Sequence, residues 1–109
     1  MKIVYNACFG GFGINPEFFD IYGIDSMYGI DRDDFWKLER SRDVRTDPRL
    51  VEYVEAHPKE EDRHGCSLLK VVDIPDNATD WFITEYDGVE TVYYVVDGKI
   101  RCCSDFAYV

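Results

Sequence analysis

Two Asp-Gly dipeptides near the C-terminus constrain the fold more than any other feature of the sequence. They are Asp87-Gly88 and Asp97-Gly98, and both lie between segments in which apolar and polar side chains alternate. Alternation with period two is typical of β-strands, and Asp-Gly between two such segments is a strong signal for a two-residue hairpin turn. We therefore predict strands at 68–74, 81–86, 90–96 and 99–103, with the last three forming an antiparallel meander.

Two-residue turns also fix which residues lie opposite one another in the meander. The predicted pairs are Trp81 with Tyr94, Ile83 with Val92, Glu85 with Glu90, Tyr86 with Val89, Tyr93 with Cys102, Tyr94 with Arg101, and Val95 with Ile100. One face then carries Phe82, Thr84, Tyr86, Thr91, Tyr93, Val95 and Ile100, and the other carries Trp81, Ile83, Glu85, Glu90, Val92, Tyr94 and Arg101. Helices can cover only one face. The other face is either an interaction surface, such as a dimer interface, or packs beneath residues 22–36.

The N-terminal half has the signals of one strand and three helices. The strand is predicted at 2–9, and glycines at 10, 11 and 13 follow it in a tight turn. Three helix starts combine capping side chains, acids or proline, and they lie at Asn15-Pro16-Glu17, at Asp31 and at Thr46-Asp47-Pro48. The sequence therefore predicts a single α+β domain over residues 1–109. Its antiparallel four- to five-stranded sheet should have two or three short helices packed on one face.

The negative charge is concentrated in the predicted meander. The formal net charge is −10, yet residues 32–63 hold ten acids and eight bases and are close to neutral. Residues 71–98 contain no base and seven acids, which are Asp73, Asp76, Asp80, Glu85, Asp87, Glu90 and Asp97. A surface of this kind repels nucleic acid and anionic membranes and favours a basic partner. The alternative interpretation is that these acids are solvated turn residues without a partner.

Glu85 and Glu90 are predicted to face each other, with Asp87 between them in the turn. Like charges directly opposite across a β-ladder are unfavourable, so such a cluster suggests an external cation or basic group. Trp81 and Tyr94 lie on the same predicted face and are candidates for aromatic contacts with a partner. The expected binding residues are therefore the seven acids together with Trp81 and Tyr94.

The sequence contains no motif typical of an enzyme. His57 and His64, the two histidines, fall in a predicted polar loop where a general base would be poorly positioned. No nucleophile elbow, zinc-protease motif or Walker lysine occurs, and the glycines at 10–13 lack the full phosphate-binding fingerprint. We expect neither catalysis nor a cofactor.

Four cysteines are present, Cys8, Cys66, Cys102 and Cys103. The N-terminus has no long apolar segment of the signal-peptide type, and no segment has the roughly 20 apolar residues that span a membrane. We therefore expect a cytoplasmic protein with reduced thiols. A metal site built from Cys8, His64 and Cys66 with one of the last two cysteines is an alternative, although the spacing does not match a common zinc motif.

Four segments resemble small proteins of bacteriophages and prophages, in the same order along the chain. They are Ile3-Val4-Tyr5-Asn6-Ala7-Cys8-Phe9-Gly10-Gly11-Phe12-Gly13, Asp43-Val44-Arg45-Thr46-Asp47-Pro48-Arg49-Leu50-Val51, Leu69-Lys70-Val71-Val72-Asp73-Ile74-Pro75 and Glu85-Tyr86-Asp87-Gly88-Val89-Glu90. The resemblance covers less than half of the chain and brings no catalytic residues. It does not extend to residues 22–38 or 96–109.

The resemblance implies an inhibitor of a host defence system, similar to anti-CRISPR proteins that occupy the basic nucleic-acid channel of an effector. We expect a basic, nucleic-acid-binding host protein as the partner, with no direct binding of nucleic acid or membrane. Two other functions stay open: a homo-oligomeric structural or regulatory protein that associates through Trp81, Val92 and Tyr94, and a metal-dependent enzyme.

Overall fold

The computed structural model describes residues 1–8, 11–57 and 68–102. Within these residues the chain forms three α-helices, one 3₁₀ segment and seven strands in small antiparallel sheets. The α+β class predicted from the sequence is confirmed. The glycine turn is described only from residue 11 onward, and His64, Cys66 and Cys103 lie outside the described residues.

The helices form where capping signals predict them. Helix α1 (Glu17–Tyr22) begins where the Asn15 side chain accepts a hydrogen bond from the Glu17 amide at 3.0 Å, and it ends at Gly23, whose φ is 63°. Helix α3 (Pro48–Ala56) begins where the Asp47 side chain caps the Arg49 amide. The helix expected after Asp31 is the 3₁₀ segment η1 (Arg32–Arg40), and the short helix α2 (Arg42–Arg45) was not expected.

The strands fall into three sheets, so the expected single sheet of four to five strands is not confirmed. Strand β1 (Lys2–Asn6) pairs with β4 (Leu69–Asp73), and the short strand β2 (Ser26–Met27) pairs with β3 (Ile30–Asp31). Strands β5 (Asp80–Tyr86), β6 (Val89–Val96) and β7 (Lys99–Cys102) form the meander. Ile74 and then Pro75 follow β4. Pro75 has no amide hydrogen to continue a ladder, and β4 and β5 belong to different sheets.

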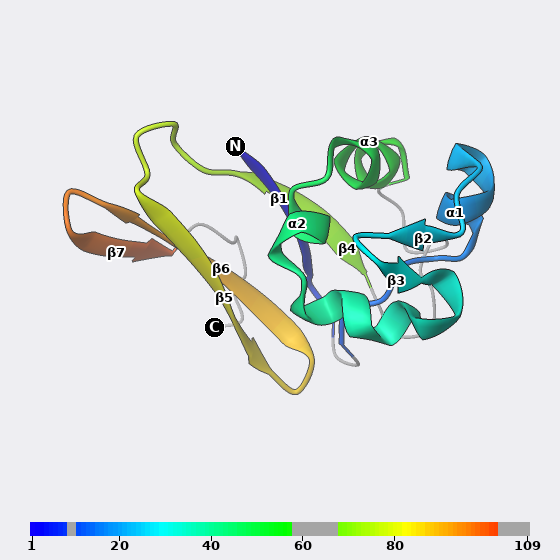
Figure 1. Cartoon of the computed structure of the whole chain (residues 1–109). Helices are drawn as coiled ribbons and strands as arrows, with labels where there is room; N and C mark the ends of the chain where they lie inside the picture. The colour runs from blue at the N-terminus through cyan, green and yellow to red at the C-terminus, as the bar shows by residue number, and fades with distance from the viewer. Residues whose placement is uncertain (9–10, 58–67, 103–109) are drawn as a thin grey trace.

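Strand β1 lies at the centre of the molecule, between the helices and the meander (Figure 1). Val4 packs into a core with α1 and α3, which contribute Phe18, Leu50 and Val54. The neighbouring Ile3 and Tyr5 point the other way and pack with Ile74, Trp81 and Val92 in a second core. Two apolar cores therefore share one strand, because successive side chains of a strand alternate between its faces.

The meander has the predicted register at every pair expected across its two turns. We call the face that carries Trp81, Val92 and Tyr94 the inner face, and the face that carries Phe82, Tyr86, Tyr93, Val95 and Ile100 the outer face. The inner face is covered by β1 and Ile74 through the second core. The sequence left open which face of the meander is covered, and it is the face that carries Trp81 and Val92.

Candidate protein-binding surface

The two hairpin turns hold carboxylates at opposite ends of the meander. Asp87 and Gly88 have φ values of 51° and 86°, and Asp97 and Gly98 have 52° and 74°. Two consecutive positive φ values are typical of the type I′ turn, which favours Asp or Asn followed by Gly. The backbone thus requires these residue types, and the aspartate side chains stay exposed at the tips.

Six of the seven predicted acids are exposed. They are Asp73, Asp76, Asp80, Glu85, Asp87 and Asp97. Three of them are partly neutralised within the chain. The N-terminal ammonium lies 3.1 Å from the Asp73 carboxylate and 3.6 Å from that of Asp76, and Arg42 lies 3.1 Å from that of Asp80.

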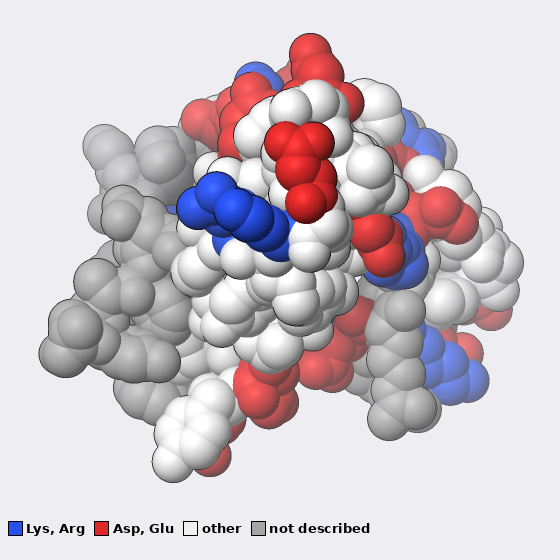
Figure 2. Space-filling model, turned by 90° about the vertical axis from the view of Figure 1, so that its left-hand side faces the viewer, with Lys and Arg blue, Asp and Glu red and all other residues white. Residues whose placement is uncertain are grey.

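Glu85, Asp87 and Asp97 form no ion pair with any described residue. Glu85 and Asp87 lie at the β5–β6 turn, and Asp97 lies at the β6–β7 turn at the other end of β6. The eight residues of β6 span roughly 25 Å. Figure 2 shows that acidic side chains on this side of the molecule form separate groups divided by uncharged surface. The negative charge is therefore distributed rather than concentrated in a single patch.

Glu90 is the exception among the acids, because it is buried, with 2% of its surface exposed. Its two carboxylate oxygens accept hydrogen bonds from Arg45 Nη1 at 2.6 Å and Nη2 at 2.8 Å. The predicted pairing of Glu85 with Glu90 is confirmed, but the expected exposed cluster of like charges is wrong. Arg45 of α2 supplies the compensating charge from inside the protein, so no external cation is needed.

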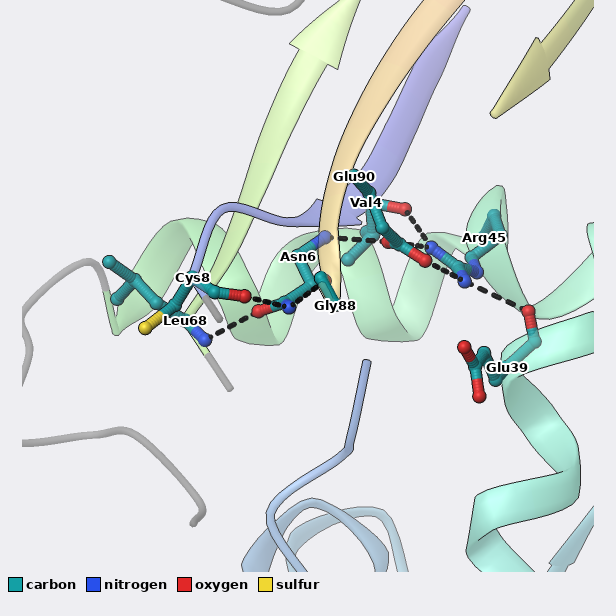
Figure 3. A network of polar contacts seen from close by, with 8 residues as sticks. All are labelled: Val4, Asn6, Cys8, Glu39, Arg45, Leu68, Gly88 and Glu90. Carbon is teal, nitrogen blue, oxygen red and sulfur yellow. Dashed lines mark hydrogen bonds and ion pairs between the residues drawn. The ribbon is translucent and has the colours of Figure 1, made fainter. Parts of the chain in front are cut away.

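The Glu90–Arg45 pair belongs to a buried polar network that joins several elements (Figure 3). Arg45 also donates to the backbone carbonyls of Val4 and Glu39, and its guanidinium lies 3.7 Å from the centre of the Phe12 ring. The Asn6 amide donates to Glu90 at 2.8 Å. These contacts connect β1, α2 and β6, and they assign Glu90 a structural role.

The Asn6 side chain completes the network at the end of β1. Its Nδ2 donates to the carbonyls of Cys8 and Gly88 at 2.6 and 2.7 Å, and its Oδ1 accepts from the Leu68 amide at 2.8 Å (Figure 3). Gly88 belongs to the β5–β6 turn, so Asn6 fixes the position of the turn that carries Asp87. Neither Asn6 nor Arg45 was identified from the sequence. The only sequence signal for the network was the unfavourable pairing of two glutamates, which a nearby cation would offset.

Trp81 and Tyr94 are not exposed aromatic anchors. Trp81 is 7% exposed, and the Arg42 guanidinium lies 4.1 Å from the centre of its ring while donating to its carbonyl at 2.9 Å. Tyr94 is half-buried beside the second core, and Val92 is fully buried. The expectation that Trp81 and Val92 are exposed is therefore wrong, because β1 already covers them.

Two large, exposed apolar side chains lie on the outer face. Tyr86 is 76% exposed and Ile100 is 63% exposed. Phe82 and Tyr93 are half-buried, and their rings stack across the two strands with centroids 5.2 Å apart. The sequence placed these side chains on one face, and it left open whether this face or the inner face is exposed.

The cysteines and histidines were the other candidate site residues in the sequence. Within residues 1–8, 11–57 and 68–102, no group of three His, Cys, Asp or Glu side chains could hold a metal ion. Cys8 is half-buried and Cys102 is exposed. His57 stacks on Tyr53 at 4.4 Å at the end of α3. The proposed ligands His64 and Cys66 lie outside the described residues, so a metal site that includes them is not tested.

Comparisons with known proteins do not identify a family. No family model matches the chain, and no curated protein or solved structure shows significant similarity to it. None of the described helices is long and apolar enough to cross a membrane. The function must therefore be argued from the surface itself.

Proposed function

We propose that the protein is an acidic binding module that binds a basic, nucleic-acid-binding protein and competes with nucleic acid for it. The observation that carries the proposal is the set of exposed carboxylates of Glu85, Asp87 and Asp97, which have no ion-pair partner among the described residues. They belong to residues 71–98, which contain no lysine or arginine. Carboxylates on a paired sheet can occupy lysine and arginine side chains that otherwise bind phosphates.

The finer form of the proposal is an inhibitor of a host defence protein, of the kind that phages encode. Its support is the resemblance of the 3–13, 43–51, 69–75 and 85–90 segments to small phage and prophage proteins. Three of these segments contain Asn6, Arg45 and Glu90, which form the buried network that positions the β5–β6 turn. The resemblance and the proposed binding surface thus meet at the same turn.

The first experiment is capture of partners from a lysate of the host cell at 50 mM and 200 mM salt. We expect a basic protein to be retained at 50 mM, and added nucleic acid to displace it. Attraction between exposed charges is screened over about 10 Å at 0.1 M ionic strength, so retention should fall at 200 mM. Binding that nucleic acid does not displace would contradict the proposed competition.

A matched pair of triple variants then tests the carboxylates. The test variant is Glu85→Gln, Asp87→Asn and Asp97→Asn, and the control is Glu17→Gln, Asp33→Asn and Asp43→Asn, all at exposed positions. Either variant moves the formal net charge from −10 to −7. Asparagine preserves the two turns because it tolerates positive φ as well as aspartate does.

We expect the test variant to bind the captured partner about tenfold more weakly at 50 mM salt, from about 0.5 kcal/mol for each exposed charge contact. If the position of the carboxylates determines binding, and not only the net charge, the control should bind like the parent. Equal binding by the test variant and the parent, measured by calorimetry, would show that these carboxylates do not form the interface.

A further inference from the structure

The outer face of the meander combines exposed apolar side chains with one sign of charge. Alternation along the strands places Asp80, Phe82, Thr84 and Tyr86 of β5 on this face, with Thr91, Tyr93 and Val95 of β6 and Ile100 of β7. None of these residues is basic. Lys99 and Arg101, the bases of β7, pair with Val96 and Tyr94 and so take inner-face positions.

Aspartates border the outer face at both ends. Asp87 lies in the turn next to Tyr86, and Asp97 lies in the turn that leads to Ile100. Asp80, which pairs with Val95, is 64% exposed although Arg42 contacts it. An aromatic surface with acids at both ends is complementary to a chain that carries several cations, because cations are attracted both to carboxylates and to aromatic rings.

We infer that the outer face binds an arginine-rich segment of the basic partner, an inference that rests on the proposed function. Tyr86, which is 76% exposed, presents its ring to a guanidinium at one end of this face. The stacked Phe82 and Tyr93 rings provide a second aromatic position, separated from Tyr86 by Thr84 and Thr91. Arginine fits better than lysine because its planar guanidinium stacks on rings and is more weakly hydrated.

A second copy of the chain fits the same face poorly. Each copy has a formal net charge of −10, and pairing two outer faces would bring Asp87 and Asp97 of both copies to one interface. Like charges at an interface oppose association. Charge complementarity thus selects a cationic segment over self-association.

The test uses a nona-arginine peptide and the isotope-labelled protein at 50 mM salt. We expect the amide signals of β5, β6 and β7 to shift on titration, and nona-lysine to bind more weakly than nona-arginine. The test variant is Tyr86→Thr with Ile100→Thr, which removes the two most exposed apolar side chains of the face but keeps residues that favour strands. The control is Ile21→Ala, which removes a side chain that is 53% exposed on α1, on the far side of the molecule (Figure 1).

The double variant should bind nona-arginine about tenfold more weakly, as expected for loss of an aromatic anchor, and the control should bind like the parent. If the double variant does not fold, the map of shifted signals on the parent protein decides the question. Shifts confined to the turn amides around Asp87 and Asp97, with unchanged affinity of the double variant, would overturn this inference and leave the proposed function standing.

Two further outcomes separate the remaining possibilities. If neither peptide binds at 50 mM salt, both this inference and the proposed function fail. If sedimentation shows a concentration-dependent dimer of the parent that the double variant does not form, the outer face is occupied by a second copy and the inference is wrong.

Discussion

At the scale of single residues, Glu85 and Glu90 illustrate how position determines the role of a side chain. They are direct partners across the β5–β6 ladder, yet Glu85 is exposed and Glu90 is buried against Arg45. A buried carboxylate stays charged only where a counter-charge and hydrogen bonds offset its desolvation. Arg45 and the Asn6 amide supply both to Glu90, whereas the exposed Glu85 carboxylate is not desolvated.

Glu90→Gln should lower the free energy of unfolding by about 3 kcal/mol, because it leaves the buried Arg45 guanidinium without a counter-charge. Glu85→Gln should change it little, since exposed substitutions rarely matter for stability. Urea denaturation followed by circular dichroism measures both variants under the same conditions. Similar midpoints for the two variants would show that the Arg45 pair does not stabilise the fold.

Asp47 should contribute to the loss of stability in acid. Burial by itself raises the pKa of its carboxyl, but hydrogen bonds from Arg49 and Tyr28 and the Arg49 charge outweigh burial, so the net pKa is lowered. A lowered folded-state pKa means that the stabilisation is complete above the unfolded value of about 4 and is lost as the pH falls below it.

Asp47→Asn keeps a good helix cap but removes this titration. We expect the variant to be less stable than the parent at pH 7 and to lose less of its stability between pH 5 and pH 2. Thermal denaturation across that range, monitored by circular dichroism, provides the comparison. If the melting temperature falls with pH in the same way in both proteins, the acid sensitivity comes from other carboxyl groups.

At the scale of elements, the β6–β7 turn depends on a backbone conformation that most residues avoid. Gly98 has a φ of 74°, and a Cβ atom added there would meet no atom within 4 Å. Gly98→Ala should therefore destabilise β7 by about 1 kcal/mol through backbone strain alone, and Gly98→Asn by less. Hydrogen exchange of the β7 amides measures the effect locally. Equal protection in both variants would exclude strain as the cause.

The elements that the sequence predicted well are those determined by local signals. The register of the meander follows from two turns of two residues each, and α3 follows from the Asp47-Pro48 start. The pairing of β1 with β4 joins residues about 70 positions apart, and no pattern of period two specifies a partner at that distance. The covered face of the meander was unpredictable for the same reason, because β1 covers it from the other end of the chain.

The candidate site was predicted in part. The exposure of Asp87 and Asp97 follows from the turn chemistry, and the sequence contained all the information needed for it. Glu90, Trp81 and Val92 were assigned to a surface because the sequence could not show that Arg45 and β1 lie over them. The division of the meander into an inner and an outer face was predicted, but which of them is exposed depends on packing between distant segments.

At the scale of the whole molecule, the net charge of −10 opposes the compact state. At 0.01 M salt the screening length is about 30 Å, comparable to the 40 × 28 × 23 Å dimensions of the molecule, so most acids repel one another. Raising the salt to 0.5 M should increase the melting temperature by a few degrees, measured by calorimetry. A decrease would show that surface ion pairs such as Lys2–Glu55 outweigh the repulsion.

The bond from the Asn6 amide to Glu90 has a consequence for synthesis of the chain. The two residues are 84 positions apart, and ribosomes add roughly 5 to 20 residues per second, so Asn6 precedes its partner by roughly 4 to 17 s. During this interval Ile3 and Tyr5 have no core to enter, because Trp81 and Val92 have not yet been made. The nascent N-terminus thus exposes an apolar segment that can aggregate. A chaperone that binds this segment until the chain is released should increase the yield of folded protein.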